Sequence, residues 1–218
     1  MINLENYRKI LDELKPFEAD LVAVSKTKPV SDIIELQSQG QTIFGENYTQ
    51  ELVIKAENIH KVDWHFIGHL QGNKVKSILP IVQLIHGIDS MKLLQEVQKQ
   101  SLKLNLRTNC LLQIFIADEK NKFGFSFEEA DELLQSDYIR NFSHVKLKGF
   151  MGMATNTDDI TKIKTEFRQL KIFMNKFPDF KILSMGMSGD YKIALEEGST
   201  MIRIGSAIFG ERNYISEA

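Results

Sequence analysis

The sequence is poor in cysteine and proline, with one and four of them in 218 residues, and it carries little net charge. A single cysteine cannot form an internal disulfide, so nothing in the chain indicates an oxidising compartment. Cys110 stands in an apolar run, where packing in the core is its expected role. The net charge of −2 provides no general attraction to nucleic acid or to anionic lipid.

Long apolar runs are also missing. No stretch approaches the ~20 apolar residues that span a bilayer, and the chain starts with a charged helical segment rather than an apolar signal region. We therefore expect a cytoplasmic protein that binds neither membrane nor nucleic acid. No glycine- or proline-rich linker divides the chain, and 43% of its residues are hydrophobic, so we expect residues 1–218 to form a single domain.

Short apolar segments alternate with longer amphipathic segments along the whole chain. Strands are predicted near residues 21–25, 42–44, 64–67, 83–85, 110–116, 146–150, 181–183 and 201–204. Helices are predicted over residues 3–14, 31–39, 48–59, 73–78, 90–104, 126–134, 160–177 and 191–197. Polar residues typical of helix starts precede four of them, at Ser31–Asp32, Asp89–Ser90, Ser126 and Thr157–Asp159.

Eight strands that alternate with helices predict an α/β fold, a single (β/α)₈ TIM-type barrel with an extra N-terminal helix. Little chain remains after Phe209 for an eighth helix, so the leading helix is expected to cover that side. The alternative is an open doubly wound sheet, which normally has a glycine-rich first turn. Here that turn reads Ser25–Pro29 and contains no glycine.

Lys26 follows the first predicted strand, Leu21–Ser25, at the point where the strand should end. At the rim of an apolar core, desolvation favours the neutral amine, which attacks aldehydes to form a Schiff base. Lys28 lies two residues further on and would point to the same side of the strand. The alternative interpretation is that Lys26 is an ordinary loop lysine. Candidate site residues also lie at the ends of other predicted strands, where barrel enzymes build their sites: Asn47, His69, Met153, Ser188, Arg203, Gly205 and Ser206.

The last two loops predict a phosphate site. Glycine lets backbone N–H groups approach an oxyanion, and Ser188 and Ser206 each add a hydroxyl. The alternative is a helix cap at Ser188 and a tight turn at Gly205. A lysine beside a phosphate site suits a phosphorylated aldehyde, of which pyridoxal 5′-phosphate is the common cofactor. Arg203 would then leave a pyridine nitrogen unprotonated, because arginine only donates hydrogen bonds; a structural ion pair is its alternative role.

Five stretches carry a resemblance to a known family. They are residues 23–29, 44–48, 64–71, 184–188 and 203–210. The sequence resembles the pyridoxal-phosphate-binding homeostasis proteins, which are similar in fold to the N-terminal barrel domain of alanine racemase.

The resemblance implies that Lys26, rather than Lys28, holds pyridoxal 5′-phosphate as an internal aldimine. It further implies that Asn47 lies near the cofactor ring and that Arg203 faces the pyridine nitrogen. Ser188, Gly205 and Ser206 would hold the phosphate, and His69 and Met153 would line the pocket.

The function implied is cofactor homeostasis, by buffering or delivering pyridoxal phosphate, with an indirect effect on amino-acid and keto-acid metabolism. Because related racemases take a second acid–base group from another domain and a partner subunit, we expect no robust turnover and name no catalytic residue. We expect a monomer without a metal, with pyridoxal-phosphate-dependent apo-enzymes as candidate partners. The alternatives are a weak racemase or decarboxylase, a Schiff-base lyase on a phosphorylated sugar, and an interaction protein in which the cofactor is structural.

Overall fold

Eight parallel strands form a closed barrel in the computed structural model, which describes residues 2–118 and 123–210. Each strand pairs with the next, and β8 pairs with β1. The strands are β1 (Asp20–Val24), β2 (Ile43–Glu46), β3 (Asp63–Phe66), β4 (Val82–Ile88), β5 (Thr108–Gln113), β6 (Val145–Met151), β7 (Ile182–Ser184) and β8 (Met201–Ile204). The predicted barrel is therefore confirmed, and the open sheet is excluded.

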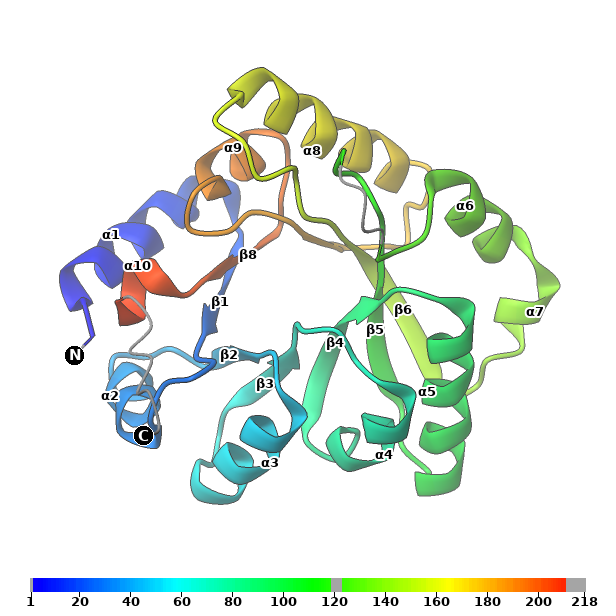
Figure 1. The fold of residues 1–218 in the computed structure, drawn as a ribbon, viewed down its shortest axis with the longest axis horizontal. Helices are drawn as coiled ribbons and strands as arrows, with labels where there is room; N and C mark the ends of the chain where they lie inside the picture. Colours follow the sequence, from blue (N-terminus) through cyan, green and yellow to red (C-terminus); the bar gives the residue numbers. More distant parts are fainter. Residues whose placement is uncertain (1, 119–122, 211–218) are drawn as a thin grey trace, which may run out of the picture.

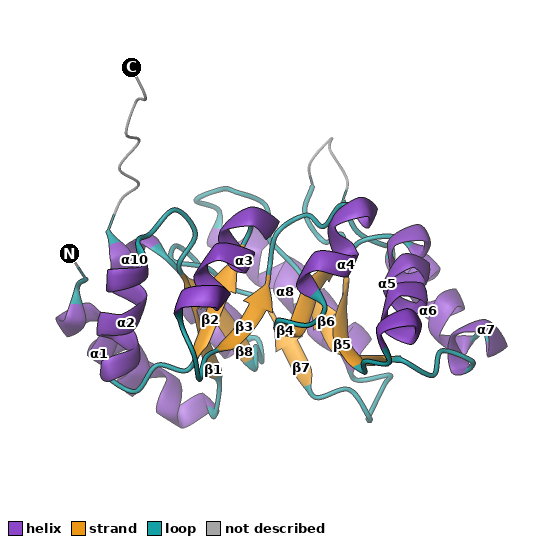
Figure 2. Ribbon diagram, turned by 90° about the horizontal axis from the view of Figure 1, so that it is seen from below, coloured by secondary structure: helices purple, strands orange, loops and turns teal. Residues whose placement is uncertain are grey.

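Helices surround the barrel, as Figure 1 shows. They are α1 (Leu4–Leu14), α2 (Val30–Ser38), α3 (Thr49–Asn58), α4 (Val75–Ile78), α5 (Met91–Leu104), α6 (Phe127–Gln135), α7 (Asp137–Arg140), α8 (Ile160–Met174), α9 (Tyr191–Glu196) and α10 (Ser206–Phe209), with 3-10 turns at Lys15–Phe17 and Gly72–Lys74. The strands run in one direction, so their carboxyl ends share one face of the molecule (Figure 2).

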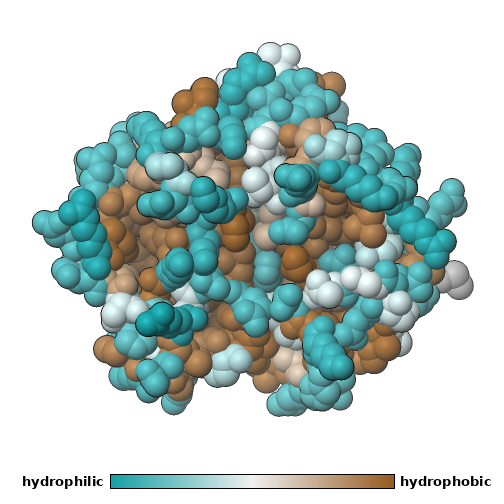
Figure 3. Space-filling model, turned by 180° about the vertical axis from the view of Figure 1, so that it is seen from behind, coloured by the Kyte–Doolittle hydropathy of each residue, from teal (hydrophilic) through white to brown (hydrophobic). Residues whose placement is uncertain are grey.

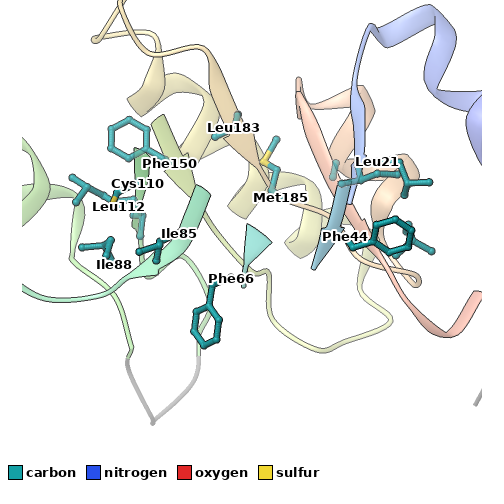
Figure 4. Packing of buried hydrophobic residues seen from close by; sticks show 14 of the residues in the cluster. Leu21, Phe44, Phe66, Ile85, Ile88, Cys110, Leu112, Phe150, Leu183 and Met185 are labelled. Atoms are coloured by element: carbon teal, nitrogen blue, oxygen red, sulfur yellow. The ribbon is translucent and has the colours of Figure 1, made fainter. Parts of the chain in front are cut away.

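Alternation along the strands divides the core into two layers. Val22 points into the barrel, where a small cluster also contains Leu84, Leu111, Met151 and Met201. Leu21 and Ala23 point outward and join the larger cluster between the sheet and the helices. Cys110 belongs to that outer layer with Leu112 and Phe150 (Figure 4), and its burial raises the pKa of the thiol. The packing role expected for Cys110 is thus confirmed.

Helices α1 and α10 together close the last side of the barrel. The Asn3 backbone N–H donates to the Ile208 carbonyl at 2.8 Å, and the Asn6 side-chain amide donates to the Ala207 carbonyl at 2.7 Å. Because α10 has only four residues, the leading helix supplies most of the cover there, as predicted.

Three of the four predicted helix starts are confirmed. Ser90, Ser126 and Asp159 each accept a hydrogen bond from a backbone N–H of the first turn. The prediction at Ser31–Asp32 is wrong, because α2 already begins at Val30 and Pro29 occupies the capping position without a side-chain bond. The fixed φ of proline suits the entrance to a helix, so Pro29 replaces a polar cap there.

None of the helices in the described chain is long and apolar enough to cross a membrane. Figure 3 shows that the face seen from behind carries mainly hydrophilic side chains, with smaller apolar areas between them.

Candidate functional site

A pocket of about 370 Å³ lies at the carboxyl ends of the strands, within the size range of small-molecule sites. Its lining comes from residues at the ends of six strands, β1, β2, β3, β6, β7 and β8, and from the loops that follow them. Seven of the eight residues predicted for the site lie around it, namely Lys26, Asn47, Met153, Ser188, Arg203, Gly205 and Ser206.

A larger hollow of about 640 Å³ opens at the opposite mouth of the barrel, among residues near the starts of the strands. Its walls combine lysines and aspartates such as Lys148 and Asp20. Ligand chemistry in barrels of this kind takes place where the strands end, so we take the smaller pocket as the candidate site.

Lys26 reaches the pocket because of the alternation of β1. Val22 and Val24 face the inside of the barrel, so Lys26 continues that side, whereas Ser25 points outward. In the pairing of β1 with β8, Arg203 lies opposite Val22, four residues before Lys26. The two side chains therefore meet the same pocket from different depths, with Arg203 at the floor and Lys26 at the rim.

Behind Lys26, a buried network of charges joins β1, β2 and α3. The Lys55 ammonium donates to Glu46 Oε1 at 2.8 Å, to Glu51 Oε2 at 3.1 Å and to the Ser25 carbonyl at 2.8 Å. The Ser25 hydroxyl donates to Glu46 Oε1 at 2.6 Å. Burial raises the pKa of Glu46 to about 7, although Lys55 and Ser25 oppose this. The sequence prediction did not include this network, although Glu51 and Lys55 have the (i, i+4) spacing of a helical ion pair.

Arg203 is buried at the floor of the pocket and is held by three hydrogen bonds. One terminal nitrogen donates to the Ser184 carbonyl at 2.8 Å and to the Ser184 hydroxyl at 2.6 Å, and the other donates to the Gly152 carbonyl at 3.2 Å. Burial lowers the pKa of Arg203 to about 10, so the guanidinium keeps its charge at neutral pH. A guanidinium has five N–H groups, and these three bonds use three of them.

Two buried histidines continue the polar chain below Arg203. Ser184 Oγ lies 3.0 Å from His86 Nδ1, and His86 Nε2 lies 3.0 Å from His65 Nδ1. Because Arg203 only donates, each contact in the chain pairs one donor with one acceptor when Ser184 donates to His86 and His86 donates to His65. Burial lowers the pKa of His65 to about 4 and that of His86 well below its usual range, so both imidazoles are neutral at pH 7.

The loops after β7 and β8 provide hydroxyls and glycines for an anion. The Ser206 hydroxyl donates to the Ser188 hydroxyl at 3.3 Å. Gly186 has a φ of +96°, and a Cβ there would lie 2.7 Å from the Ala194 Cβ, so this turn requires glycine. A Cβ on Gly189 would meet no atom within 4 Å, so the pocket is open above its backbone.

Asn47 gives a direct test of whether the pocket fits a polar ligand. Its side-chain oxygen Oδ1 is buried and accepts no hydrogen bond from the described residues, although Asn47 lines the pocket. Such a group normally has a partner, so a ligand that donates a hydrogen bond would complete the site. Asn47, the Lys26 amine at the rim and the hydroxyls of Ser188 and Ser206 fit a phosphorylated pyridine aldehyde.

His69 does not line this pocket. Its imidazole Nδ1 lies 2.8 Å from Asp89 Oδ2, and its ring packs against Phe123 at 4.8 Å between centroids. A neighbouring hollow contains both His69 and Asp89. Met153 does line the predicted pocket, where it stands 42% exposed at the mouth.

Comparison with known proteins adds sequence relatives to this geometry. The model of the alanine racemase N-terminal domain matches residues 4–213. The pyridoxal phosphate homeostasis protein of Pasteurella multocida is 41% identical over 207 residues, with 89% of this chain and 87% of that protein covered. The protein of the same name from Escherichia coli K12 is 36% identical over 208 residues, with 91% and 88% covered.

The chain belongs to the pyridoxal phosphate homeostasis protein family. Among solved structures, PipY of Synechococcus elongatus PCC7942, solved without pyridoxal phosphate, is 30% identical with a TM-score of 0.86, covering 94% of this chain and 99% of PipY. PipY with pyridoxal phosphate bound is 28% identical with a TM-score of 0.84, over the same shares of the two chains. Alanine racemase of Clostridium difficile 630 shares the barrel fold at 15% identity and a TM-score of 0.77, over 99% of this chain and 59% of the racemase.

The histidine chain beneath Arg203 is the part of this family member's site that sequence reasoning missed. The strand-end pattern singles out neither His65 nor His86, and Ser184 belongs only to the stretch 184–188 that carries the family resemblance. Their partners lie 21 and 98 residues apart in the sequence, so no local spacing indicates them. Among the described residues, no group of three or more His, Cys, Asp or Glu side chains could hold a metal ion.

Proposed function

We propose that this protein binds pyridoxal 5′-phosphate as a Schiff base on Lys26 and acts in the homeostasis of that cofactor. The observation that carries the proposal is a single pocket in which a rim lysine, an arginine floor and paired serine hydroxyls converge. The relatives named pyridoxal phosphate homeostasis proteins, and PipY with pyridoxal phosphate bound, support the same ligand.

Each group in the pocket has a chemical counterpart on this ligand. The neutral Lys26 amine condenses with the aldehyde carbon and one water is lost, so atoms balance without another reactant. Ser188 and Ser206, with Gly205 between the strand and α10, bind the phosphate, and Asn47 accepts a hydrogen bond beside the ring. Bound pyridoxal phosphate supplies an electron sink for carbanions.

The floor weakens that electron sink. Arg203 only donates hydrogen bonds, so it leaves a facing pyridine nitrogen unprotonated. Among the described residues that line the pocket, the titratable groups are Lys26, Lys28 and Arg203, without a histidine, tyrosine or carboxylate. A racemase needs a second acid–base group on the other face of the ring, so this lining supports a binding role without robust turnover.

The proposed homeostasis role requires release as well as capture. We propose that pyridoxal-phosphate-dependent apo-enzymes receive the cofactor from a monomeric, cytoplasmic form of this protein. Reversible imine formation supports such a role, because hydrolysis returns the aldehyde intact.

The first test is the visible absorption of purified protein incubated with pyridoxal phosphate, for the wild type and Lys26→Ala. We expect an imine band in the wild type that disappears on borohydride reduction and is absent in the variant, with the reduced adduct located on Lys26 by peptide mass. Absence of a band in the wild type at excess cofactor would contradict the proposal and favour a lyase on a phosphorylated sugar. An adduct on Lys28 instead would reassign the reactive lysine.

A further inference from the structure

The backbone on both sides of Lys26 is held by the buried network of charges behind it. Resting on the proposed imine at Lys26, we infer that Glu51, anchored by Lys55, is a positioning residue that fixes the direction of the Lys26 side chain.

The residue directly after Lys26 has an unusual backbone conformation. Thr27 has a φ of +64°, in the left-handed region that L residues rarely adopt. A β-branched residue is a particularly poor occupant of that region, because its Cβ and the following carbonyl approach too closely. Strain of this kind persists only where surrounding contacts impose it, and it concentrates at functional sites.

Glu51 imposes this conformation. The Thr27 backbone N–H donates to both carboxylate oxygens of Glu51, at 3.1 Å to Oε1 and 2.9 Å to Oε2. Hydrogen bonds to an ionised acceptor are about twice as strong as neutral ones. Against the effect of burial, the side-chain contact with Glu46, the Thr27 N–H and the Lys55 ammonium together lower the pKa of Glu51, so the carboxylate that holds Thr27 is charged at neutral pH.

Lys55 anchors this carboxylate and also holds the residue before Lys26. Its ammonium bonds Glu51 Oε2 and the Ser25 carbonyl, while the Ser25 hydroxyl bonds Glu46. The side chains of Lys55 and Glu46 are 6% and 0% exposed, so water does not screen their contact. Both neighbours of Lys26 are thus fixed to α3 and β2, which sets the direction in which the Lys26 side chain leaves the backbone.

Positioning makes a different prediction from general support of the fold. A misdirected amine slows attack on the aldehyde but leaves the phosphate and ring contacts of the pocket unchanged. A merely structural role would weaken every ligand alike. Pyridoxine 5′-phosphate, which carries an alcohol in place of the aldehyde, separates the two because it occupies the pocket without bonding to Lys26.

The experiment compares the wild type with Glu51→Ala in the full chain. One measurement is the rate of imine formation with pyridoxal 5′-phosphate, and the other is the dissociation constant of pyridoxine 5′-phosphate. We expect imine formation to slow by on the order of tenfold and the dissociation constant to change less than about twofold. Glu51→Gln retains one acceptor for Thr27, so its rate of imine formation should lie between those of the wild type and Glu51→Ala. This variant replaces Glu51→Ala if the latter does not fold.

A rescue variant and a matched control complete the design. Glycine adopts positive φ without steric cost, so Thr27→Gly in the Glu51→Ala background should recover most of the lost rate. Glu166→Ala is the control, because Glu166 is a carboxylate that likewise holds a loop threonine, accepting from Thr155 N at 2.7 Å and Oγ1 at 2.6 Å. It should leave the imine rate unchanged.

The outcomes are distinct. A wild-type imine rate in Glu51→Ala would overturn the inference, as would an equal loss of affinity for pyridoxine 5′-phosphate or an equal loss of rate in Glu166→Ala. If the wild type itself forms no imine on Lys26, the proposed function fails and the inference fails with it. Selective slowing in Glu51→Ala with recovery by Thr27→Gly would establish the positioning role.

Discussion

Single residues in the interior of this barrel depend on partners that cannot be replaced by water. Arg203, Ser184, His86 and His65 are all fully or almost fully buried, and each one satisfies the next. Removing one member leaves a buried polar atom without a partner, which costs the full desolvation penalty of that atom. The chain is therefore sensitive to substitutions that would be harmless on the surface.

Ser184→Ala tests this at the scale of one hydroxyl. The variant leaves Arg203 its bond to the Ser184 carbonyl but deprives His86 Nδ1 of its partner. We expect the free energy of unfolding to fall by about 1–3 kcal/mol in urea denaturation. Ser77→Ala removes an exposed hydroxyl that donates to the Lys74 carbonyl, and it should change the free energy of unfolding by less than about 0.5 kcal/mol. Equal effects of the two substitutions would contradict the interpretation of the chain.

At the scale of elements, the contact between β2 and α3 includes a buried ion pair, Glu46 with Lys55, beside the apolar packing of the core. Glu46 ends β2 with its side chain fully buried, and one of its oxygens, Oε2, has no partner among the described residues. Its pKa is raised from 4.5 to about 7, mainly by burial. Protonation of Glu46 therefore affects how firmly these two elements hold together.

The stability of the protein should depend on pH through this group. Between pH 4.5 and about 7 the folded state retains a proton on Glu46 that the unfolded state has released, so rising pH favours unfolding. This contribution is complete below pH 4.5 and is lost as pH rises through about 7, with a size of up to about 3 kcal/mol. Denaturation across this window should show the decline in the wild type and a smaller one in Glu46→Gln. The same dependence of stability on pH in the wild type and in Glu46→Gln would contradict the prediction.

Helix α6 has a start whose strength can be measured directly. Ser126 Oγ accepts from the Glu129 N–H at 3.1 Å, and the Glu129 carboxylate accepts from the Ser126 N–H at 2.8 Å, which forms a complete capping box. Ser126→Ala should lower the free energy of unfolding by about 1 kcal/mol. The cap of α5 is longer, at 3.4 Å from the Leu93 N–H to Ser90 Oγ, so Ser90→Ala should cost less. Thermal or urea unfolding of both variants provides the comparison.

At the scale of the whole molecule, closure of the barrel depends on contacts between the two ends of the described chain. Helix α1 packs beside α10, and their contacts join residues about 200 positions apart (Figure 1). Asn6→Ala removes the amide that donates to the Ala207 carbonyl at 2.7 Å. We expect a loss of about 1 kcal/mol, together with faster amide exchange in α10 than in α5. Unchanged exchange in α10 would show that α1 does not hold this side closed.

The order and type of the elements could be predicted from the sequence because each strand repeats a short apolar pattern. Most of the pocket could be predicted too, since the carboxyl ends of parallel strands meet at one face. Residues such as Lys26 and Ser206 follow strand ends directly, whereas the partners of Lys55 and His86 depend on which side chains a closed barrel brings face to face. The position of His69 also depends on a tertiary contact, its pairing with Asp89, which no local pattern specifies.

The hydrogen-bond chain through the barrel has a direction, and this direction acts as a fixed dipole. It starts at a guanidinium that has no acceptor, so reversing it would require the loss of a proton from Arg203. The pKa of His65 is about 4 and that of Arg203 is about 10, and the pKa of His86 lies well below its usual range. Between those limits Arg203 keeps its positive charge at the floor of the pocket and both histidines stay neutral. The pocket floor therefore favours a ligand atom that carries a lone pair because of the fixed direction of these hydrogen bonds, and not because a group gains or loses a proton.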